Sequence, residues 1–261
     1  MEHRFDLGPR GQLIVVDDTT ALAQCAVDIA LSTVSAAQAA RGWAHVALSG
    51  GSTPRQMGEL LARQPYRDLV LWHNLHVFWG DERWVPLESP ESNAGVAKRT
   101  FLDHVPIPAA QVHPYETERV TPEESAERYA SLLREVVPVE HGLPRLDLIF
   151  LGMGEDGHTA SLFPHSAAIR EDEALVVAHH VPALNATRLT MTPPVLNAGH
   201  HVVFLVTGAS KAARLKEVLE GPDRPDELPA QIVRPVLGEL TWLVDRAAAR
   251  ALSVASELVH G

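Results

Sequence analysis

Short apolar runs that alternate with longer amphipathic stretches restrict the fold of this chain more than any other feature of its sequence. Short apolar runs bounded by turn residues are typical of buried strands, and amphipathic stretches are typical of helices that cover a sheet. The run at residues 146–151 is almost wholly apolar, as a parallel strand covered on both faces requires. We therefore expect a single α/β domain over residues 1–261, with a doubly wound, mainly parallel sheet and helices on both faces.

The expected strands share a short apolar core, and the expected helices share capping residues or an amphipathic body. We expect strands at residues 13–16, 43–48, 75–79, 146–151, 175–178, 188–191, 202–207 and 240–244. We expect helices at residues 19–41, 54–63, 93–102, 122–137, 210–219 and 246–259.

Charge and composition narrow the classes of function. The 22 Lys and Arg against 33 Asp and Glu give a net charge of −11, which argues against a nucleic-acid or anionic-membrane partner. A small anionic substrate needs only a local basic cluster, so it stays open. The single cysteine, Cys25, excludes an intramolecular disulfide and a cysteine-based zinc site. No apolar run approaches the length of a membrane helix and the N-terminus lacks a signal-peptide pattern, so we expect a cytoplasmic protein.

The first candidate site is the loop that follows the strand at residues 43–48. Its glycines allow backbone N–H groups to approach an anion, and the helix that begins there adds unpaired N–H donors. The loop lacks the Gly-Lys-Ser/Thr of a Walker A motif, and a tight, well-capped turn is the alternative interpretation. The candidate phosphate-binding residues are Gly50, Gly51, Ser52, Thr53 and Arg55.

The second candidate site is the glycine loop at residues 152–158, after the strand at residues 146–151. It matches G-x-G-x-x-G, but Pro164 interrupts any following helix, so we interpret the match as accidental. Asp156 and His158 lie where open α/β sheets bind their ligands, and a neutral imidazole can take a proton from water. The alternative is a polar loop with one incidental histidine among the 14 in the chain.

Further polar residues follow other strands. Asp81 and Arg83 come after the strand at residues 75–79, Arg188 begins a strand, and Lys211 follows residues 202–207. Polar, mostly cationic clusters at several strand ends predict one focused anion pocket, although Asp81 and Arg83 alone also suit a surface ion pair. No set of residues has the spacing of metal ligands, so we expect neither a metal nor another cofactor.

The order and spacing of these motifs resemble the family of 6-phosphogluconolactonases, in the larger group that includes glucosamine-6-phosphate deaminases and ribose-5-phosphate isomerases. The resemblance runs from about residue 46 to residue 245. Its motifs are ALSGGSTPR at 47–55, FWGDERWVP at 78–86, LDLIFLGMGEDGHTASLFP at 146–164, RLTMTPPVLN at 188–197, VTGASKA at 206–212 and PAQIV at 229–233.

The resemblance implies hydrolysis of 6-phospho-D-glucono-1,5-lactone to 6-phosphogluconate, a step of the oxidative pentose phosphate pathway, without a metal. In this interpretation His158 is the base, and Asp156 orients either His158 or a substrate hydroxyl. Arg83 or loop N–H groups stabilise the oxyanion. Asp81 is a further candidate catalytic residue, which orients a substrate hydroxyl. The phosphate-binding candidates are Gly50, Gly51, Ser52, Thr53, Arg55, Arg188 and Lys211.

The alternative within this group is a deaminase or isomerase that acts on another sugar phosphate. The deaminase pattern has a Glu where this chain has Phe163, which we expect to be buried, and an aromatic residue where it has Arg83. Both differences favour lactone hydrolysis. A non-catalytic sugar-phosphate sensor is a third possibility, but no length is left for a DNA-binding domain. We expect a monomer or a small homo-oligomer.

Overall fold

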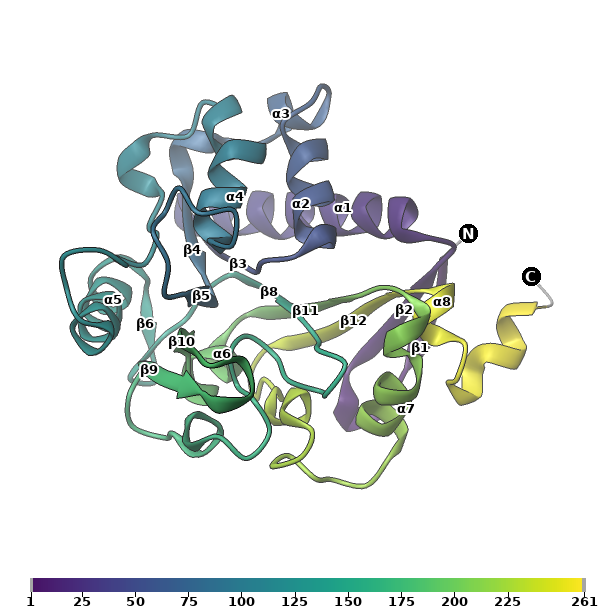
Figure 1. The fold of residues 1–261 in the computed structure, drawn as a ribbon. Helices are drawn as coiled ribbons and strands as arrows, with labels where there is room; N and C mark the ends of the chain where they lie inside the picture. The colour runs from purple at the N-terminus through teal and green to yellow at the C-terminus, as the bar shows by residue number, and fades with distance from the viewer. Residues whose placement is uncertain (1, 260–261) are drawn as a thin grey trace.

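A seven-stranded sheet forms the centre of the molecule (Figure 1). The computed structural model describes residues 2–259. The strand order is β1-β2-β12-β11-β8-β3-β4, and every neighbouring pair is parallel except β1 with β2. The strands are β1 (Glu2–Asp6), β2 (Gln12–Val16), β3 (Ala44–Leu48), β4 (Leu75–Trp79), β8 (Leu148–Gly152), β11 (His201–Val206) and β12 (Glu239–Asp245).

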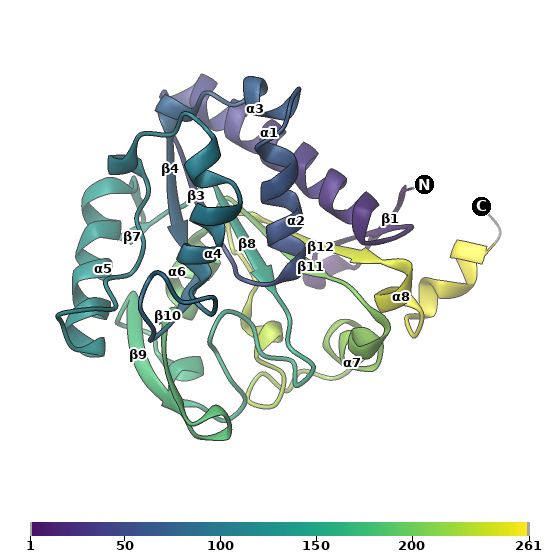
Figure 2. The same cartoon turned by 45° about the horizontal axis from the view of Figure 1, so that its top comes forward.

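Helices cover both faces of this sheet, which confirms the predicted doubly wound α/β fold. In Figures 1 and 2, α1 and α2 lie on one face, and α6 and α7 lie on the other. The helices are α1 (Thr19–Arg41), α2 (Ser52–Leu61), α3 (Tyr66–Leu69), α4 (Asn93–Thr100), α5 (Pro122–Val136), α6 (Pro193–Ala198), α7 (Ala212–Glu220) and α8 (Arg246–Ala249).

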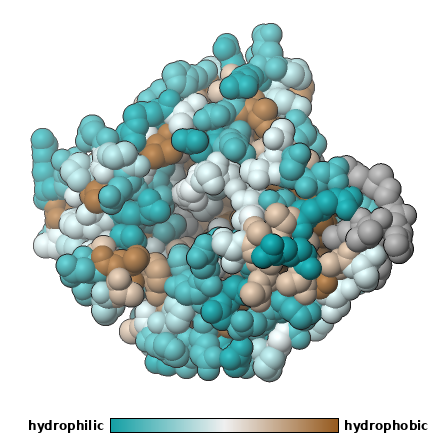
Figure 3. All heavy atoms as spheres, turned by 45° about the vertical axis from the view of Figure 1, so that its right-hand side comes forward, coloured by the Kyte–Doolittle hydropathy of each residue, from teal (hydrophilic) through white to brown (hydrophobic). Residues whose placement is uncertain are grey.

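The fully buried strands of the central sheet form the core. All five residues of β3 are buried, and the largest buried side chains include Trp79, Phe150, Phe204 and Trp242. Figure 3 shows that the outer surface on one side is mostly hydrophilic, with small and separate hydrophobic patches.

A second, antiparallel sheet lies beside the first and corrects the prediction for two strands. It contains β5 (Asp81–Arg83), β10 (Ala186–Met191) and β9 (Val176–Val181), in that order. We expected residues 175–178 and 188–191 to be strands, which is right, but they do not join the central sheet. Strands β6 (Val139–Glu140) and β7 (Leu143–Pro144), of two residues each, pair as a hairpin and complete the strands of the described chain.

The helix predicted at residues 246–259 is wrong in its length. Asp245 caps α8 by accepting a hydrogen bond from the Ala248 backbone N–H at 2.7 Å, but the helix ends at Ala249. Ser253 then donates its backbone N–H to Glu220 of α7 at 2.6 Å. This contact between elements redirects the chain, and a 3-10 helix (Ser253–Val259) follows.

Helix α1 corrects the expectation that no apolar stretch of this chain approaches the length of a membrane helix. By length and composition alone it is apolar enough to cross a membrane. Uncharged Thr, Ser and Gln residues interrupt its apolar runs, which is why no single run stood out. In the structure α1 packs along the central sheet and buries one side, including Leu22, Val27 and Val34, as a core helix of a globular domain does.

The order of the strands locates the crevice where a ligand is expected. The chain passes from β3 to β4 on one side, and later enters β8 on the other side of β3 before continuing to β11 and β12. Such a reversal of strand order separates the loops at the carboxyl ends of the two flanking strands. Here those strands are β3 and β8, whose loops carry the two glycine-rich motifs.

Candidate active site

A cavity of about 370 Å³ opens at the carboxyl ends of β3 and β8. Its size suits a small-molecule ligand. The loops after β3 and β8, the second sheet and the turn before α7 surround it. The lining residues are Ser49, Gly50, Gly51, Asp81, Arg83, Asn93, Gly152, Met153, Gly154, His158, Ala160, Ser161, Phe163, Leu184, Arg188 and Lys211.

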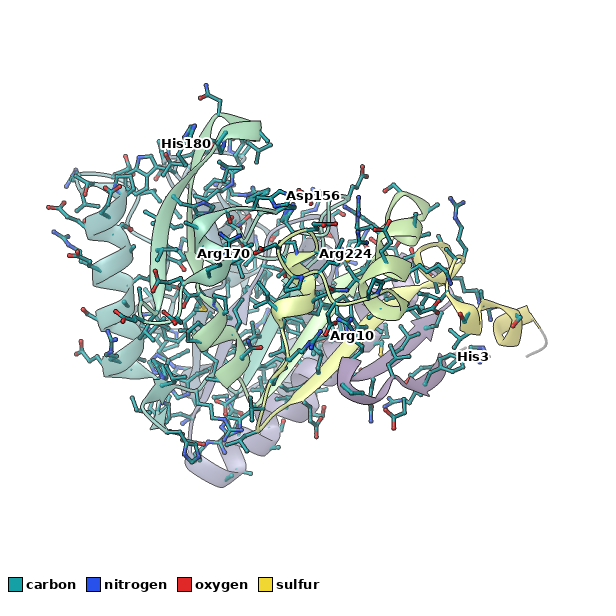
Figure 4. All side chains as sticks on the ribbon, turned by 90° about the horizontal axis from the view of Figure 1, so that it is seen from below. His3, Arg10, Asp156, Arg170, His180 and Arg224 are labelled. Atoms are coloured by element: carbon teal, nitrogen blue, oxygen red, sulfur yellow. The ribbon has the colours of Figure 1, made fainter. Side chains whose placement is uncertain are left out.

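His158 is held in one orientation by Asp156. The His158 Nδ1 lies 2.6 Å from the Asp156 Oδ1. Because a carboxylate only accepts hydrogen bonds, Nδ1 carries the proton and Nε2 keeps its lone pair. Asp156 does not line the cavity itself, and Figure 4 shows it on the loop after β8. This arrangement favours the orienting role for Asp156 over direct contact with a substrate.

The Asp156 carboxylate keeps its negative charge beside His158 over a wide pH range. Burial raises the pKa of Asp156, but the hydrogen bond and the charge of His158 outweigh burial and lower that pKa to about 2. Asp156 is therefore ionised at neutral pH. An ionised carboxylate on Nδ1 stabilises the imidazolium that forms when Nε2 takes a proton.

Gly154 makes room for this pair. A Cβ at Gly154 would lie 2.1 Å from the His158 Nδ1 and 2.5 Å from the Asp156 Oδ1, which is too close for any side chain. Its backbone N–H donates to the His158 carbonyl oxygen at 2.8 Å. The glycine that we treated as part of an accidental dinucleotide motif thus makes the contact between Asp156 and His158 possible.

Phe163 lies against the imidazole of His158. The two rings stack with their centroids 4.2 Å apart. Phe163 is half-buried and lines the cavity, so the expectation that it is fully buried was wrong. A phenyl ring at this place packs against His158 and offers no group that exchanges protons.

The glycine loop after β3 forms one wall of the cavity. Gly50 is required because a Cβ there would lie 1.8 Å from the Asn93 Oδ1. Gly51 has a φ of 114° and precedes α2, whose N-terminus has no side-chain cap. Ser49, which the sequence analysis did not single out, also lines the cavity, and its buried Oγ has no hydrogen-bond partner among the described residues.

Three of the predicted phosphate-binding residues do not line the cavity. Arg55 is exposed on α2 and lies 3.7 Å from Glu59, four residues along the same helix. The buried Thr53 uses its hydroxyl on Thr207, 3.1 Å away. Ser52 is exposed at the first turn of α2. The structure therefore does not bring the Arg55 charge or the Thr53 hydroxyl into the cavity.

Three cations that we singled out do line the cavity: Arg83, Arg188 and Lys211. Arg83 and Arg188 are directly opposite each other on β5 and β10. Burial and the neighbouring Arg83 charge lower the pKa of Arg188. Within residues 2–259, none of the three forms an ion pair with a carboxylate; Arg83 donates to the Glu91 carbonyl oxygen at 2.5 Å. Three cations against the single carboxylate of Asp81 in one cavity favour an anionic ligand.

Asp81 is the acidic group of the cavity and is largely buried. Its carboxylate accepts a hydrogen bond from the Ser161 hydroxyl at 2.7 Å, and its backbone carbonyl accepts one from Asn93 at 3.0 Å. Neighbouring Glu82 is turned away into the N-terminus of α4, where it accepts the backbone N–H groups of Asn93 and Ala94. Ser161 and Asn93 were missed, although both lie near the quoted motifs.

A metal centre finds no support in these side chains. Across residues 2–259, no three His, Cys, Asp or Glu side chains lie together in a way that could hold a metal ion.

The sequence and the fold of this chain both match one family of known proteins. Residues 17–242 match the family model for glucosamine-6-phosphate isomerases/6-phosphogluconolactonase. The chain is 41% identical to the 6-phosphogluconolactonase of Synechocystis sp. over 242 residues, which cover 92% of this chain and 98% of that protein. It is 39% identical to the 6-phosphogluconolactonase of Haemophilus influenzae, over 80% of this chain and 87% of that protein.

Solved structures agree on the fold. The 6-phosphogluconolactonase of Trypanosoma brucei superimposes with a TM-score of 0.83 at 28% identity, covering 92% of this chain and 98% of that one. A monomeric glucosamine-6-phosphate deaminase superimposes with a TM-score of 0.77 at 21% identity, over 92% of this chain and 99% of that one. The second likeness shows a shared fold and no more.

Proposed function

The chain belongs to the family of glucosamine-6-phosphate isomerases and 6-phosphogluconolactonases, and we propose that its lactone hydrolysis uses His158 as the base. Its relatives at 39–41% identity are 6-phosphogluconolactonases, and the chain is a lactone hydrolase of the oxidative pentose phosphate pathway. The observation that carries the mechanism is the imidazole of His158, oriented by a carboxylate at Nδ1 in a cavity with three unpaired cations.

The proposed reaction begins with a water molecule beside the Nε2 of His158. Nε2 takes one proton from the water while its oxygen forms a bond to C1 of 6-phospho-D-glucono-1,5-lactone. The bond between C1 and the ring oxygen then breaks, and the ring oxygen takes the proton back from His158. The product is 6-phosphogluconate, whose new carboxyl group ionises and releases a proton.

The charged groups of the cavity have separate proposed roles. Arg188, Lys211 and the N–H groups of Gly50, Gly51 and Ser52 hold the 6-phosphate. Arg83 or loop N–H groups stabilise the oxyanion that develops at C1. The phosphate does not react, so the free energy of its binding positions the carbonyl carbon next to the water.

Asp81 is proposed to accept a hydrogen bond from a sugar hydroxyl. Its side chain borders the cavity, and the Ser161 hydroxyl occupies only one of its two carboxylate oxygens at short range. Thr53 and Arg55 have no part in this proposal, because their side chains are engaged elsewhere.

The proposed function is tested by following acid release from freshly prepared 6-phosphogluconolactone. We expect the purified protein to accelerate hydrolysis far above the spontaneous rate, and to keep its full activity after exhaustive chelation. Spontaneous rates alone would reject the function. A loss on chelation that zinc restores would reject the metal-free mechanism.

The alternative, deamination of glucosamine 6-phosphate, is disfavoured by Phe163. Ring opening in this group pairs the histidine with a glutamate, and here the matching side chain is the phenyl ring stacked on His158. We expect no ammonia release from glucosamine 6-phosphate under conditions that give rapid lactone hydrolysis. Ammonia release at a comparable rate would reverse this assignment.

We further propose that the enzyme is a cytoplasmic monomer or small homo-oligomer without nucleic-acid or membrane partners. Its net charge of −11 and the small, separate hydrophobic patches on the face shown in Figure 3 support this. Light scattering of the purified protein and fractionation of cells that produce it test the two statements.

A further inference from the structure

Ser161 connects the loop that carries the base to all three strands of the second sheet. Its hydroxyl donates to Asp81 on β5 at 2.7 Å, and its backbone N–H donates to the Thr190 Oγ1 on β10 at 3.3 Å. Its carbonyl oxygen lies 2.7 Å from the His179 Nε2 on β9. One residue, three positions after His158, thus fixes the loop to the sheet that carries Arg83 and Arg188.

His179 makes the third of these bonds and has no place in the mechanism above. It lies directly opposite Arg188, which in turn lies opposite Arg83. Opposite residues of neighbouring strands project from the same face of a sheet. The three side chains therefore form one row, with the two cations in the cavity and His179 at the end of the row under the loop.

The chemistry of the contact defines the state of His179. A carbonyl oxygen only accepts, so Nε2 carries the proton and donates it to Ser161. Burial lowers the pKa of His179, and the Arg188 charge lowers it further, although the bond to Ser161 opposes them. A neutral imidazole therefore supplies the donor beside Arg188 without adding a third positive charge to the row.

The ring of His179 also lies near a second residue of the loop after β8. The centroid of the Phe163 ring lies 4.2 Å from that of His158, on which it stacks, and 6.5 Å from that of His179, to which it is tilted by 51°. His179 thus binds the loop backbone at Ser161 and neighbours the phenyl ring that packs on His158.

We propose that His179 is a positioning residue for lactone hydrolysis, which fixes the separation between the base His158 and the cations Arg83 and Arg188. This inference rests on the proposed function. The mechanism needs the attacking water and the oxyanion site to be held at fixed distances from one carbon atom, C1 of the lactone. A displacement of about 1 Å in such a site can cost up to about 100-fold in rate.

The test uses three substitutions of His179. His179→Gln keeps an N–H donor that can reach the Ser161 carbonyl, His179→Phe keeps the ring without a donor, and His179→Ala removes both. We expect kcat to fall about tenfold in the Phe and Ala variants, and to stay within about threefold of wild type in the Gln variant. KM for the phosphorylated lactone should change less than kcat in all three.

A matched control lies next to His179 in the sequence. His180 is exposed and projects from the opposite face of β9, at the outer part of the β9–β10 hairpin in Figure 4. His180→Ala should leave kcat and KM unchanged. Thermal unfolding of every variant separates a loss of folded protein from a loss of turnover in the folded protein.

The decisive comparison is His179→Gln against His179→Phe. Both side chains fill the space of the imidazole, so this comparison does not require the Ala variant to fold. A higher kcat in the Gln variant supports the positioning role. Equal kcat values for Gln and Phe, or a His179→Ala variant as active as His180→Ala, would overturn it. Wild-type protein without lactonase activity would reject the proposed function instead, so the two failures are distinguishable.

Discussion

Two groups of histidines in this molecule differ in where their rings lie. His45 on β3, His76 on β4 and His113 stack in a column, with centroids 5.3 and 5.2 Å apart. The His76 Nδ1 lies 2.9 Å from the His113 Nε2, and the His45 Nδ1 lies 3.3 Å from the Asp147 Oδ2, so each ring has one nitrogen engaged within the fold. His158 also has one nitrogen engaged, by Asp156, but it lines the cavity, whereas no ring of the column does. The position of the second nitrogen at the cavity therefore distinguishes His158, and the residue type does not.

The cations of the cavity also differ from cations elsewhere in the molecule, in whether a carboxylate pairs with them. Away from the cavity, Arg41 pairs with Asp147, and Arg145 pairs with Glu140 at 2.5 Å. Within the described residues, the cations of the cavity have no such partners. Pairing neutralises a charge within the fold, and an unpaired group can bind a ligand. This contrast predicts that substitutions in the two regions affect different properties.

The largest effect is expected for His158→Ala. Removing a general base costs about 100-fold to 10,000-fold in rate, and we expect kcat to fall about 1,000-fold. The fold should persist, because the ring lies at the cavity surface. Initial rates on the phosphorylated lactone measure this, with His76→Ala as the control from the histidine column. Equal kcat values for the two variants would remove His158 from the base position.

A smaller effect is expected for Lys211→Ala. Loss of one charge-assisted contact to phosphate should raise KM for 6-phosphogluconolactone about tenfold to thirtyfold. KM for unphosphorylated gluconolactone should not change. Lys98, which pairs with Asp103 on the surface at 2.9 Å, provides the control Lys98→Ala. The same change in KM for both substrates would place Lys211 away from the phosphate.

The central sheet was predictable because its strands are short, apolar and separated by turn signals. Residues 146–151 and 202–207 need no knowledge of their partners to be recognised as buried strands. The partners of residues 175–178 and 188–191 could not be predicted, because tertiary packing decides which sheet a half-buried strand joins. The strand Asp81–Arg83 was missed because its residues are all polar; Glu82 is buried only by the N-terminus of α4.

The site was predictable where a motif follows a strand end. His158, Gly50 and Lys211 lie at such ends and line the cavity. Ser161 and His179 were missed because their contacts join residues that are distant in sequence: the Ser161 hydroxyl binds the Asp81 carboxylate, and His179 binds the Ser161 backbone carbonyl. Arg55 was included because of its charge, although its spacing of four residues from Glu59 already indicated a pair along the helix surface.

The pair of Asp156 and His158 gives a third test. Asp156→Asn preserves an acceptor for Nδ1 but removes the negative charge that stabilises the imidazolium. A charge-assisted hydrogen bond is about twice as strong as a neutral one, so we expect kcat to fall about tenfold. Glu155→Gln, an exposed carboxylate on the same loop, is the matched control. An unchanged kcat in Asp156→Asn would show that the negative charge is not needed and that an uncharged acceptor at Nδ1 is enough.

The smallest effect concerns stability, and it arises in the histidine column. Burial, with the neighbouring His76 and His45, lowers the pKa of His113 to about 4. The unfolded chain has a histidine pKa of about 6.5, so it binds more protons than the folded state between pH 6.5 and 4. Stability should therefore be complete above about pH 6.5 and should fall as the pH is lowered toward 4.

The expected loss from His113 is about 1 kcal/mol, well below the value implied by the full pKa difference, because the half-buried ring is partly screened by solvent. His113→Phe should reduce this pH dependence while keeping the stack on Phe78, whose centroid lies 4.6 Å away. Urea unfolding of both proteins at pH 7 and pH 5 measures the difference. Because no ring of the column lines the cavity, kcat at pH 7 should be the same in both. A variant whose stability fell as steeply with pH as that of wild type would show that the acid sensitivity does not come from His113, and the contrast between the two histidine groups would then rest on the catalytic rates alone.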